Sequence, residues 1–407
     1  MFLNDTRKSI VSLQIAQRVQ AIKPSPTLAV TARAAEMRAA GHDIIGLGAG
    51  EPDFDTPQHI KDAAVEALNK GHTKYTPVDG IPALKQAVIN KFARDNQLEY
   101  GMKQVLVSCG GKHSFYNLAQ ALLNPGDEAI IPAPYWVSYP DMVMLAGAEP
   151  VIISAGIQQG FKITPKQLEA AMTEKTRLFV LNSPSNPTGV HYTPAELAEL
   201  GAVIRHYPKV IVVTDDIYEH ILWEGAPFKN ILNMCTDLYD RTMVLNGVSK
   251  TYSMTGWRIG YAGGPEQLIQ KMKTIQSQST SNPTSIAQHG ALAALEGEQS
   301  FIQQMVTTFK DRHDFVLKSL LEIKGIECLP CQGTFYIFPN LQGVMDRLGI
   351  KTDIELGEIL IEKAKVAIVP GSAFGAPGHV RISFATSMEN LEKAMERLHN
   401  TLHAMVQ

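Results

Sequence analysis

The chain has 407 residues, 45% of them hydrophobic, which is enough for two domains of ordinary size with a substantial buried core. Its 37 Lys and Arg residues nearly balance its 40 Asp and Glu residues, so the composition predicts no basic surface for nucleic acid or an anionic membrane. Four cysteines are too few for a disulfide framework, and no apolar stretch is long enough to span a bilayer.

The first twenty residues mix charged with apolar positions and lack both a hydrophobic core and a small-residue cleavage site. They predict no signal peptide, and we expect a cytoplasmic protein. Further along, Gly46, Gly48 and Gly50 resemble part of a dinucleotide-binding fingerprint. The residues that follow, EPDFDTP at 51–57, do not open a helix as that mechanism requires, so a nicotinamide cofactor is not expected.

Short apolar runs then alternate with helical segments. Each run ends in polar or turn residues, and the runs lie at residues 104–111, 128–134, 176–187, 209–218 and 242–250. Continuous apolar runs of this length are typical of parallel strands that are buried on both faces, which predicts an α/β fold with a mainly parallel sheet flanked by helices. Ligands of such sheets bind beyond the carboxyl ends of the strands, so the polar residues that end the runs are the candidate site residues.

The last hundred residues follow a different pattern. Residues 298–322 predict a long helix, and the apolar segments after it predict a small α+β domain. Residues before about 54 lack the strand–helix alternation and are expected to pack with this part. We therefore predict a large cofactor-binding domain at 55–300 and a small domain built from 1–54 and 301–407.

Two cysteines in this C-terminal part are spaced as a CxxC pair. Cys328 and Cys331 have no second pair and no nearby histidine in the sequence. A structural zinc site needs four ligands, so we interpret the pair as structural and expect no metal.

Lys250 ends one of the apolar runs and is followed by TYSMTGWRIGY. A surface lysine near a buried tryptophan is the simpler interpretation, but a lysine that only faces solvent is less expected at a strand end. Its amine becomes a nucleophile when burial or a neighbouring cation lowers its pKa. Arg258 is a candidate for that cation, and its planar fork also suits a phosphate.

Three further strand ends carry candidate residues. Asp215 and Asp216 end one run, with Tyr218 following, although paired acids there also suit a metal site or a helix cap. Residues 186–189, NPTG, predict a tight turn, which alone indicates only a loop. Residues 110–112, GGK, predict a glycine turn into a helix, whose free N–H groups form an anion site.

Together these residues suit a phosphate, a protonated ring nitrogen, a ring hydroxyl and an aldehyde, which pyridoxal 5'-phosphate combines. The chain resembles the fold-type I, class I aminotransferases, and specifically the bacterial aspartate aminotransferase family. The resemblance runs from about residue 13 to the C-terminus. It rests on the order of the motifs AGEPDFDTP, TKYTPVDGIPALK, GGK, PAPYWVSYPDM, NSPSNPTG, TDDIYEH, SKTYSMTGWRIGY and HVRISFATS.

The resemblance implies roles for five residues around the ring of the cofactor. Lys250 would bind the cofactor covalently and, once displaced by substrate, carry the proton of the reaction. Asp215 would pair with the ring nitrogen and keep it protonated. Tyr218 and Asn186 would bind the ring oxygen, and Trp136 would stack on the ring face. The bond between Asn186 and Pro187 is cis in relatives.

The phosphate would be held by the backbone of Gly110, Gly111 and Lys112, by Arg258, and by Tyr75 of the partner subunit in a homodimer with shared active sites. Relatives of the animal type add a serine three positions before the lysine. This sequence has Gly247 there, so the grip on the phosphate must rest on other groups.

The substrate would lie in the same pocket. Arg381 and the Gly50 backbone would bind the α-carboxylate, next to Trp136 and Asn186. Bacterial relatives use lysines for the distal carboxylate, and Lys112 and Lys23 match those positions. The alternatives are a surface lysine at a helix start for Lys112 and a solvated loop lysine for Lys23.

The function implied is a homodimeric aminotransferase that works by a ping-pong cycle on amino acids and 2-oxo acids. Aspartate or glutamate would be the donor, and 2-oxoglutarate or oxaloacetate the acceptor. Three alternatives remain open on the same fold. They are an aminotransferase for aromatic substrates, alanine or prephenate, a β-eliminating C–S lyase, and a non-catalytic protein for ligand sensing or assembly.

Overall fold

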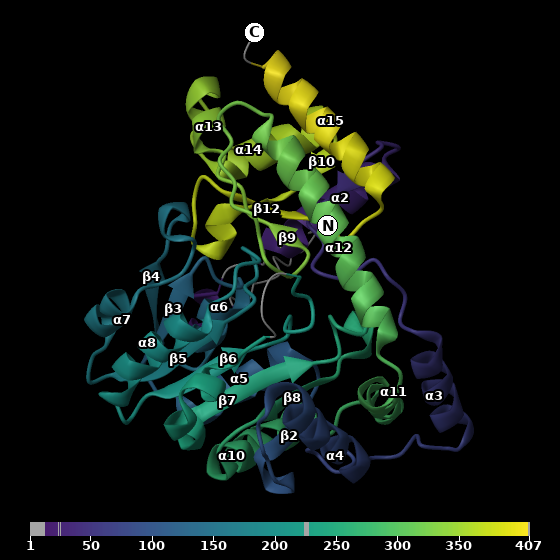
Figure 1. Cartoon of the computed structure of the whole chain (residues 1–407), viewed down its shortest axis with the longest axis vertical. Coiled ribbons are helices and arrows are strands. Elements are labelled where there is room, and N and C mark those ends of the chain that lie inside the picture. Colours follow the sequence, from purple (N-terminus) through teal and green to yellow (C-terminus); the bar gives the residue numbers. More distant parts are fainter. Residues whose placement is uncertain (1–12, 23, 25, 224–227, 406–407) are drawn as a thin grey trace, which may run out of the picture.

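The computed structural model describes residues 13–22, 24, 26–223 and 228–405. Figure 1 shows a large sheet with its helices in the lower part of the molecule and a smaller group of strands and helices above it. The long helix α12 (Ser300–Leu321) runs from one part into the other.

The large sheet has seven strands in the order β2-β8-β7-β6-β5-β3-β4. β8 is antiparallel to both of its neighbours, and the other strands run parallel to one another. The strands are β2 (Val105–Ser108), β3 (Glu128–Ala133), β4 (Glu149–Ser154), β5 (Thr176–Asn182), β6 (Ile211–Asp215), β7 (Thr242–Gly247) and β8 (Gly260–Gly263). The α/β fold predicted from the sequence is confirmed.

Successive side chains of these strands are buried on opposite faces of the sheet. In β5, Phe179 and Leu181 belong to one hydrophobic core, and Leu178 and Val180 belong to another. Side chains of a strand alternate between faces, so a strand covered on both sides must be apolar throughout. This explains the continuous apolar runs in the sequence.

Helices cover both faces of the sheet. They are α3 (Gln58–Asn69), α4 (Pro82–Lys91), α5 (Gly111–Leu122), α6 (Ser138–Leu145), α7 (Pro165–Ala171), α8 (Pro194–Arg205), α9 (Ile231–Met234), α10 (Glu266–Ser277) and α11 (Ser285–Glu296). α8 shows why one of them starts where it does. Thr193 accepts a hydrogen bond from the backbone of Glu196, whose side chain bonds back to Thr193, and Pro194 occupies the first turn.

The smaller part has its own core. β9 (Tyr336–Ile337), β11 (Val369–Pro370) and β12 (Val380–Ser383) form one sheet, and α13 (Gln342–Leu348), α14 (Asp353–Ile359) and α15 (Met388–Ala404) pack around it. From the N-terminal segment, α1 (Gln17–Gln20) contacts α6, and β1 (Ile45–Gly46) pairs with β10 (Val366–Ala367). α2 (Pro26–Ala39) contacts β10 and β11. The domain boundaries at 54/55 and 300/301 stay a prediction.

Two findings bear on the remaining expectations. None of the described helices is long and apolar enough to cross a membrane. Cys331 is buried, and neither it nor Cys328 forms a disulfide.

We predict that Phe179→Ala lowers the free energy of unfolding by about 3–5 kcal/mol, because it empties a fully buried site in the centre of the sheet. Ile152→Ala on the edge strand β4 is the matched control. Ile152 is 40% exposed, so its loss should cost about 1 kcal/mol or less. Denaturant unfolding followed by circular dichroism compares the two, and equal losses would contradict this picture of the core.

Candidate active site

A cavity of about 340 Å³ lies where β5, β6 and β7 end. Its walls combine residues from these strand ends with residues from α2, α5, α6 and β12. Those predicted from the sequence that line it are Gly50, Gly111, Lys112, Trp136, Asn186, Asp215, Tyr218, Lys250, Arg258 and Arg381. The structure thus brings together side chains separated by more than three hundred residues in the sequence.

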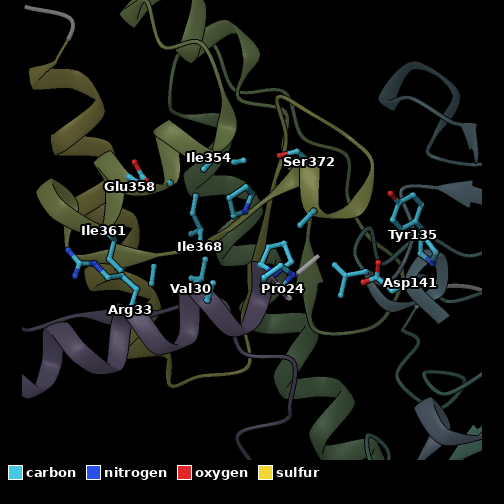
Figure 2. Close-up of a pocket in the computed structure, with 18 of the residues that line it drawn as sticks. Pro24, Val30, Arg33, Tyr135, Asp141, Ile354, Glu358, Ile361, Ile368 and Ser372 are labelled. Atoms are coloured by element: carbon cyan, nitrogen blue, oxygen red, sulfur yellow. The ribbon is translucent and has the colours of Figure 1, made fainter. Parts of the chain in front are cut away.

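A larger cavity of about 670 Å³ is lined by other residues of α2 and by residues of the smaller part (Figure 2). Its centre is aliphatic, with Val30, Ile361 and Ile368, and Figure 2 shows Arg33 extending away from that centre. A binding site usually combines an apolar wall with a few polar groups that converge. The smaller cavity has that combination, so we place the candidate active site there.

Lys250 reaches into the smaller cavity from the loop after β7. Its Nζ donates a hydrogen bond to the Gly50 carbonyl at 2.5 Å and lies about 6 Å from the rings of Tyr218 and Phe335. Burial, and secondarily the positive charge of Arg381, lowers the pKa of the Lys250 amine to about 8. About a tenth of the amine is therefore neutral, and nucleophilic, at pH 7, which is a far larger fraction than for a lysine of ordinary pKa.

The two aspartates at the end of β6 face different surroundings. Asp215 lines the cavity and accepts hydrogen bonds from the Tyr139 hydroxyl at 2.6 Å and the Ile217 backbone at 3.3 Å. Asp216 is fully buried, bonds to Thr214, and has its pKa raised to about 8 by burial and by nearby Glu219. The two carboxylates do not converge, so the structure does not favour the metal alternative. Burial also raises the pKa of Asp215, which a cationic N–H donor in the cavity would offset.

The start of α5 forms an anion cradle. Gly110 precedes the helix with φ of +91°, and a Cβ there would lie 2.2 Å from Nη2 of Arg258. The first N–H groups of a helix have no acceptor within it, and here they adjoin the Arg258 guanidinium. Arg258 is held by the carbonyls of Thr255 and Cys109 at 2.8 and 3.3 Å. This cradle suits a phosphate.

Gly247, which replaces the serine of animal-type relatives, lies where a side chain does not fit easily. It pairs with Gly260 across β7 and β8, and a Cβ at Gly247 would lie 3.0 Å from the Gly260 Cα and the Ile259 carbonyl. Ser249 and Thr255 line the cavity, and the Thr255 carbonyl accepts a hydrogen bond from Arg258.

Arg381, from β12, is a buried cation at the other end of the cavity. Its Nη1 donates to Asn186 Oδ1 at 3.0 Å and its Nη2 to the Gly48 carbonyl at 2.8 Å. Within the described part of the chain, no carboxylate lies at ion-pair distance from it. Tyr336 and Phe374 instead place their rings 4.3 and 5.0 Å from its Cζ. A carboxylate that enters the cavity could form an ion pair with Arg381.

A chain of amide contacts links the two ends of the site. Asn182, the last residue of β5, donates to the Asp215 carbonyl at 2.9 Å and accepts from the Asn186 backbone N–H at 2.9 Å. Asn186 in turn bonds to Arg381, and its bond to Pro187 is cis, as the resemblance implies.

The other predicted residues are placed as follows. Lys112 lies with its Nζ 5.0 Å from the Trp136 ring, and burial together with Arg258 lowers the pKa of its amine. Gly110 is not among the residues that line the cavity, but it lies against Arg258, which does line it. Tyr75 does not line it and is 92% exposed. Lys23 lies outside the described residues.

Among the lining residues that were not predicted from the sequence, Tyr139, Asn182 and Tyr336 contact predicted site residues. Asn182 carried a usable signal, because it ends an apolar run. Tyr139 lies in the first turn of α6, and its ring contacts that of Trp136, which precedes the helix; no sequence pattern indicates its bond to Asp215. Tyr336 lies in an apolar segment of the small sheet, and nothing in its neighbours indicates a polar contact.

Comparisons with known proteins agree with this geometry. The sequence profile described as "Aminotransferase class I and II" matches residues 42–398. The aspartate/prephenate aminotransferase of Nitrosomonas europaea is 57% identical over 96% of this chain and all of that protein. The aspartate aminotransferase of Geobacillus stearothermophilus is 52% identical over the same shares.

Solved structures give the same result. The aspartate aminotransferase of Rhizobium meliloti superposes with a TM-score of 0.92 at 45% identity, over 96% of this chain and 99% of that one. The Thermus thermophilus enzyme with maleate superposes with a TM-score of 0.91 at 42% identity, over 96% and 100%.

We predict that Lys250 reacts with an amine acylating reagent with a pH midpoint near 8, because only the neutral amine reacts and its pKa is lowered to that value. An ordinary lysine has its midpoint near 10.4. Competitive labelling with acetic anhydride, followed by peptide mass spectrometry, measures the midpoints of Lys250 and of the exposed lysines in one sample. Arg381→Met should move the Lys250 midpoint upward, and an unshifted midpoint near 10.4 in the wild type would show that the site does not activate this amine.

Proposed function

This chain belongs to the class I and II aminotransferase family, and we propose that it uses pyridoxal 5'-phosphate to transfer amino groups from aspartate or glutamate to 2-oxoglutarate or oxaloacetate. One observation carries the proposal. A lysine of lowered pKa, a buried carboxylate, a phosphate cradle and an unpaired arginine converge on a single cavity. A cytoplasmic location stays a prediction.

The donor set fits pyridoxal 5'-phosphate. The α5 cradle and Arg258 would hold the phosphate, Asp215 the ring nitrogen, Tyr218 and Asn186 the ring oxygen, and Trp136 would cover the ring face. When bound, this cofactor supplies an aldehyde for an amine and a ring that withdraws electrons from the substrate. An Asp215 held by Tyr139 keeps its charge directed at the ring nitrogen.

Lys250 has the properties of a proton carrier. With a pKa of about 8, its amine accepts a proton and gives it up again near neutral pH, which a general base and acid requires. Its bond to the Gly50 carbonyl keeps Nζ at the cavity centre while it is not covalently engaged. Lys250 would take the proton from Cα of the substrate and deliver it to the carbon that carries the aldehyde of the cofactor, C4′.

Arg381 would orient the substrate. A guanidinium binds a carboxylate through two parallel hydrogen bonds, which fixes both the position and the plane of the amino acid. Since its present partners are neutral, the α-carboxylate would be its only full counter-charge among the described groups.

Two lines support an acidic substrate. Lys112 adds a further cation to the cavity, besides Lys250, Arg258 and Arg381, and would favour a ligand with a second carboxylate. Related proteins at 50% identity or above are named aspartate or aspartate/prephenate aminotransferases. Prephenate is therefore the second candidate acceptor. The role of Lys23 stays a prediction.

The geometry of the Tyr75 loop supports a homodimer with shared sites. Gln276 donates to the Val78 carbonyl at 2.7 Å, and Gln288 to Thr76 Oγ1 at 3.0 Å. Asp79, a few residues on, forms an ion pair with Lys85 at 2.6 Å. An aromatic side chain that is 92% exposed on a loop fixed in this way is suited to contact another subunit.

We predict that the protein supplied with pyridoxal 5'-phosphate shows a visible absorption band that aspartate converts to a near-ultraviolet one, and that 2-oxoglutarate restores. Lys250→Ala should lose this response, whereas Lys209→Ala, at an exposed lysine, should retain it. A band that responds to alanine or phenylalanine but not aspartate would overturn the substrate. Absence of any visible band would overturn the proposal that the protein uses pyridoxal 5'-phosphate. Prephenate in place of 2-oxoglutarate tests the second acceptor.

We predict that Tyr75→Ala and Lys250→Ala proteins, each impaired alone, regain about one quarter of wild-type activity when unfolded and refolded together. Half of the dimers are then mixed, and each mixed dimer has one intact site out of two. Mixing each variant with wild type provides the control. No recovery, or a fully active Tyr75→Ala protein, would contradict a site shared between subunits.

A further inference from the structure

Tyr336 contacts both ends of the candidate active site. It is fully buried on β9, and its hydroxyl lies 3.1 Å from the hydroxyl of Tyr218. Its ring lies 4.3 Å from Cζ of Arg381. One side chain therefore joins a residue that would bind the cofactor to one that would bind the substrate carboxylate.

We propose that Tyr336 is a positioning residue with two separable roles: its hydroxyl directs the proton of Tyr218, and its ring supports the charge of Arg381. The inference rests on the proposed function and deepens it, because it links cofactor tuning to carboxylate binding through one side chain.

The first role follows from the pairing of two phenols. Only one proton lies between the oxygens of Tyr336 and Tyr218. When Tyr336 supplies it, the proton of Tyr218 is left to point into the cavity, as a donor to a ring oxygen requires. Hydrogen bonds in a chain polarise one another, so a Tyr218 that accepts from Tyr336 is also a stronger donor. Burial raises the pKa of both phenols, which keeps both protons in place.

The second role follows from the surroundings of Arg381. Its guanidinium is buried, its acceptors are the neutral Asn186 and Gly48 oxygens, and its faces meet the rings of Tyr336 and Phe374. The negative face of an aromatic ring attracts a cation, most strongly where water is excluded. The ring of Tyr336 thus stabilises the charged guanidinium of Arg381 while no substrate carboxylate is bound.

Two measurements on three variants separate these roles. The first is the pH midpoint of the visible band of the enzyme loaded with pyridoxal 5'-phosphate. The second is the Kd for maleate, a dicarboxylate without an amino group, by calorimetry. The variants are Tyr336→Phe, which removes only the hydroxyl, Tyr336→Leu, which also removes the ring, and Phe374→Leu, which removes the other ring.

Tyr336→Phe should raise the pH midpoint by about half to one unit, because a weaker donor at Tyr218 leaves the ring oxygen and the linked lysine nitrogen more basic. Its Kd for maleate should stay within about twofold of the wild type. Tyr336→Leu should raise the midpoint similarly and weaken maleate about tenfold. Phe374→Leu should weaken maleate by a comparable factor with no change in midpoint.

An unchanged midpoint in Tyr336→Phe would overturn the first role. Wild-type maleate affinity in Tyr336→Leu would overturn the second. If Tyr336→Leu does not fold, Tyr336→Phe still tests the role of the hydroxyl. Phe374→Leu then tests whether aromatic rings support Arg381, and wild-type maleate affinity in that variant would overturn the second role. A wild type without any band would overturn the proposed function, whereas a normal wild-type band with an unshifted Tyr336→Phe overturns this inference alone.

Discussion

The burial of the central sheet on both faces is the constraint on which the site depends. Because helices cover each face, the middles of β5, β6 and β7 are apolar and their polar side chains lie near the ends of the strands. The strands run parallel, so their carboxyl ends meet at one edge of the sheet and place Asn182 beside Asp215. Lys250 follows the next strand by three residues and reaches the same place. The chemistry of the protein is therefore concentrated at this edge as a consequence of how the sheet is covered.

Charges near this edge fall into two groups that differ in how they are compensated. Behind the strand ends, Lys91 bonds to Glu219 and to Asn96 at 2.7 Å, and Asn246 donates to Glu219 at 2.7 Å. A buried charge is tolerated when it is paired and hydrogen-bonded in this way, and such a network supports the turn that carries Tyr218. The proximity of Glu219, Asp95 and His220 therefore reflects an ion-pair network, in which Lys91 already supplies the positive charge.

Inside the cavity the compensation is incomplete. Arg381 has neutral acceptors, burial lowers the pKa of Lys250, and burial raises the pKa of Asp215. Each of these costs folding free energy that a ligand of opposite charge would return. Groups of this kind persist in a folded protein where function requires them, which makes the contrast with the satisfied network informative about the site.

The sequence predicted those parts of the structure that local patterns determine. Apolar runs predicted β2, β3, β5, β6 and β7, but not β4 or β8, and β8 has glycine at both ends and little apolar character of its own. The same limit applies to the site. Asp215 ends a recognisable strand and Lys250 follows one by three residues, whereas Tyr139 and Tyr336 act through contacts with residues far away in the chain. Such contacts depend on packing between elements, which no short pattern records.

Substrate specificity is the least predictable property for a related reason. Arg381 is fixed by two hydrogen bonds and two rings, so its position follows from the packing of the small sheet against the large one. Lys112 lies instead at the exposed start of α5, where its Nζ lies 5.0 Å from the centre of the Trp136 ring. A side chain with so few restraints can be exchanged without disturbing the fold. The fold therefore determines the position of the arginine that we propose binds the α-carboxylate, while the group that would recognise the rest of the substrate is free to vary.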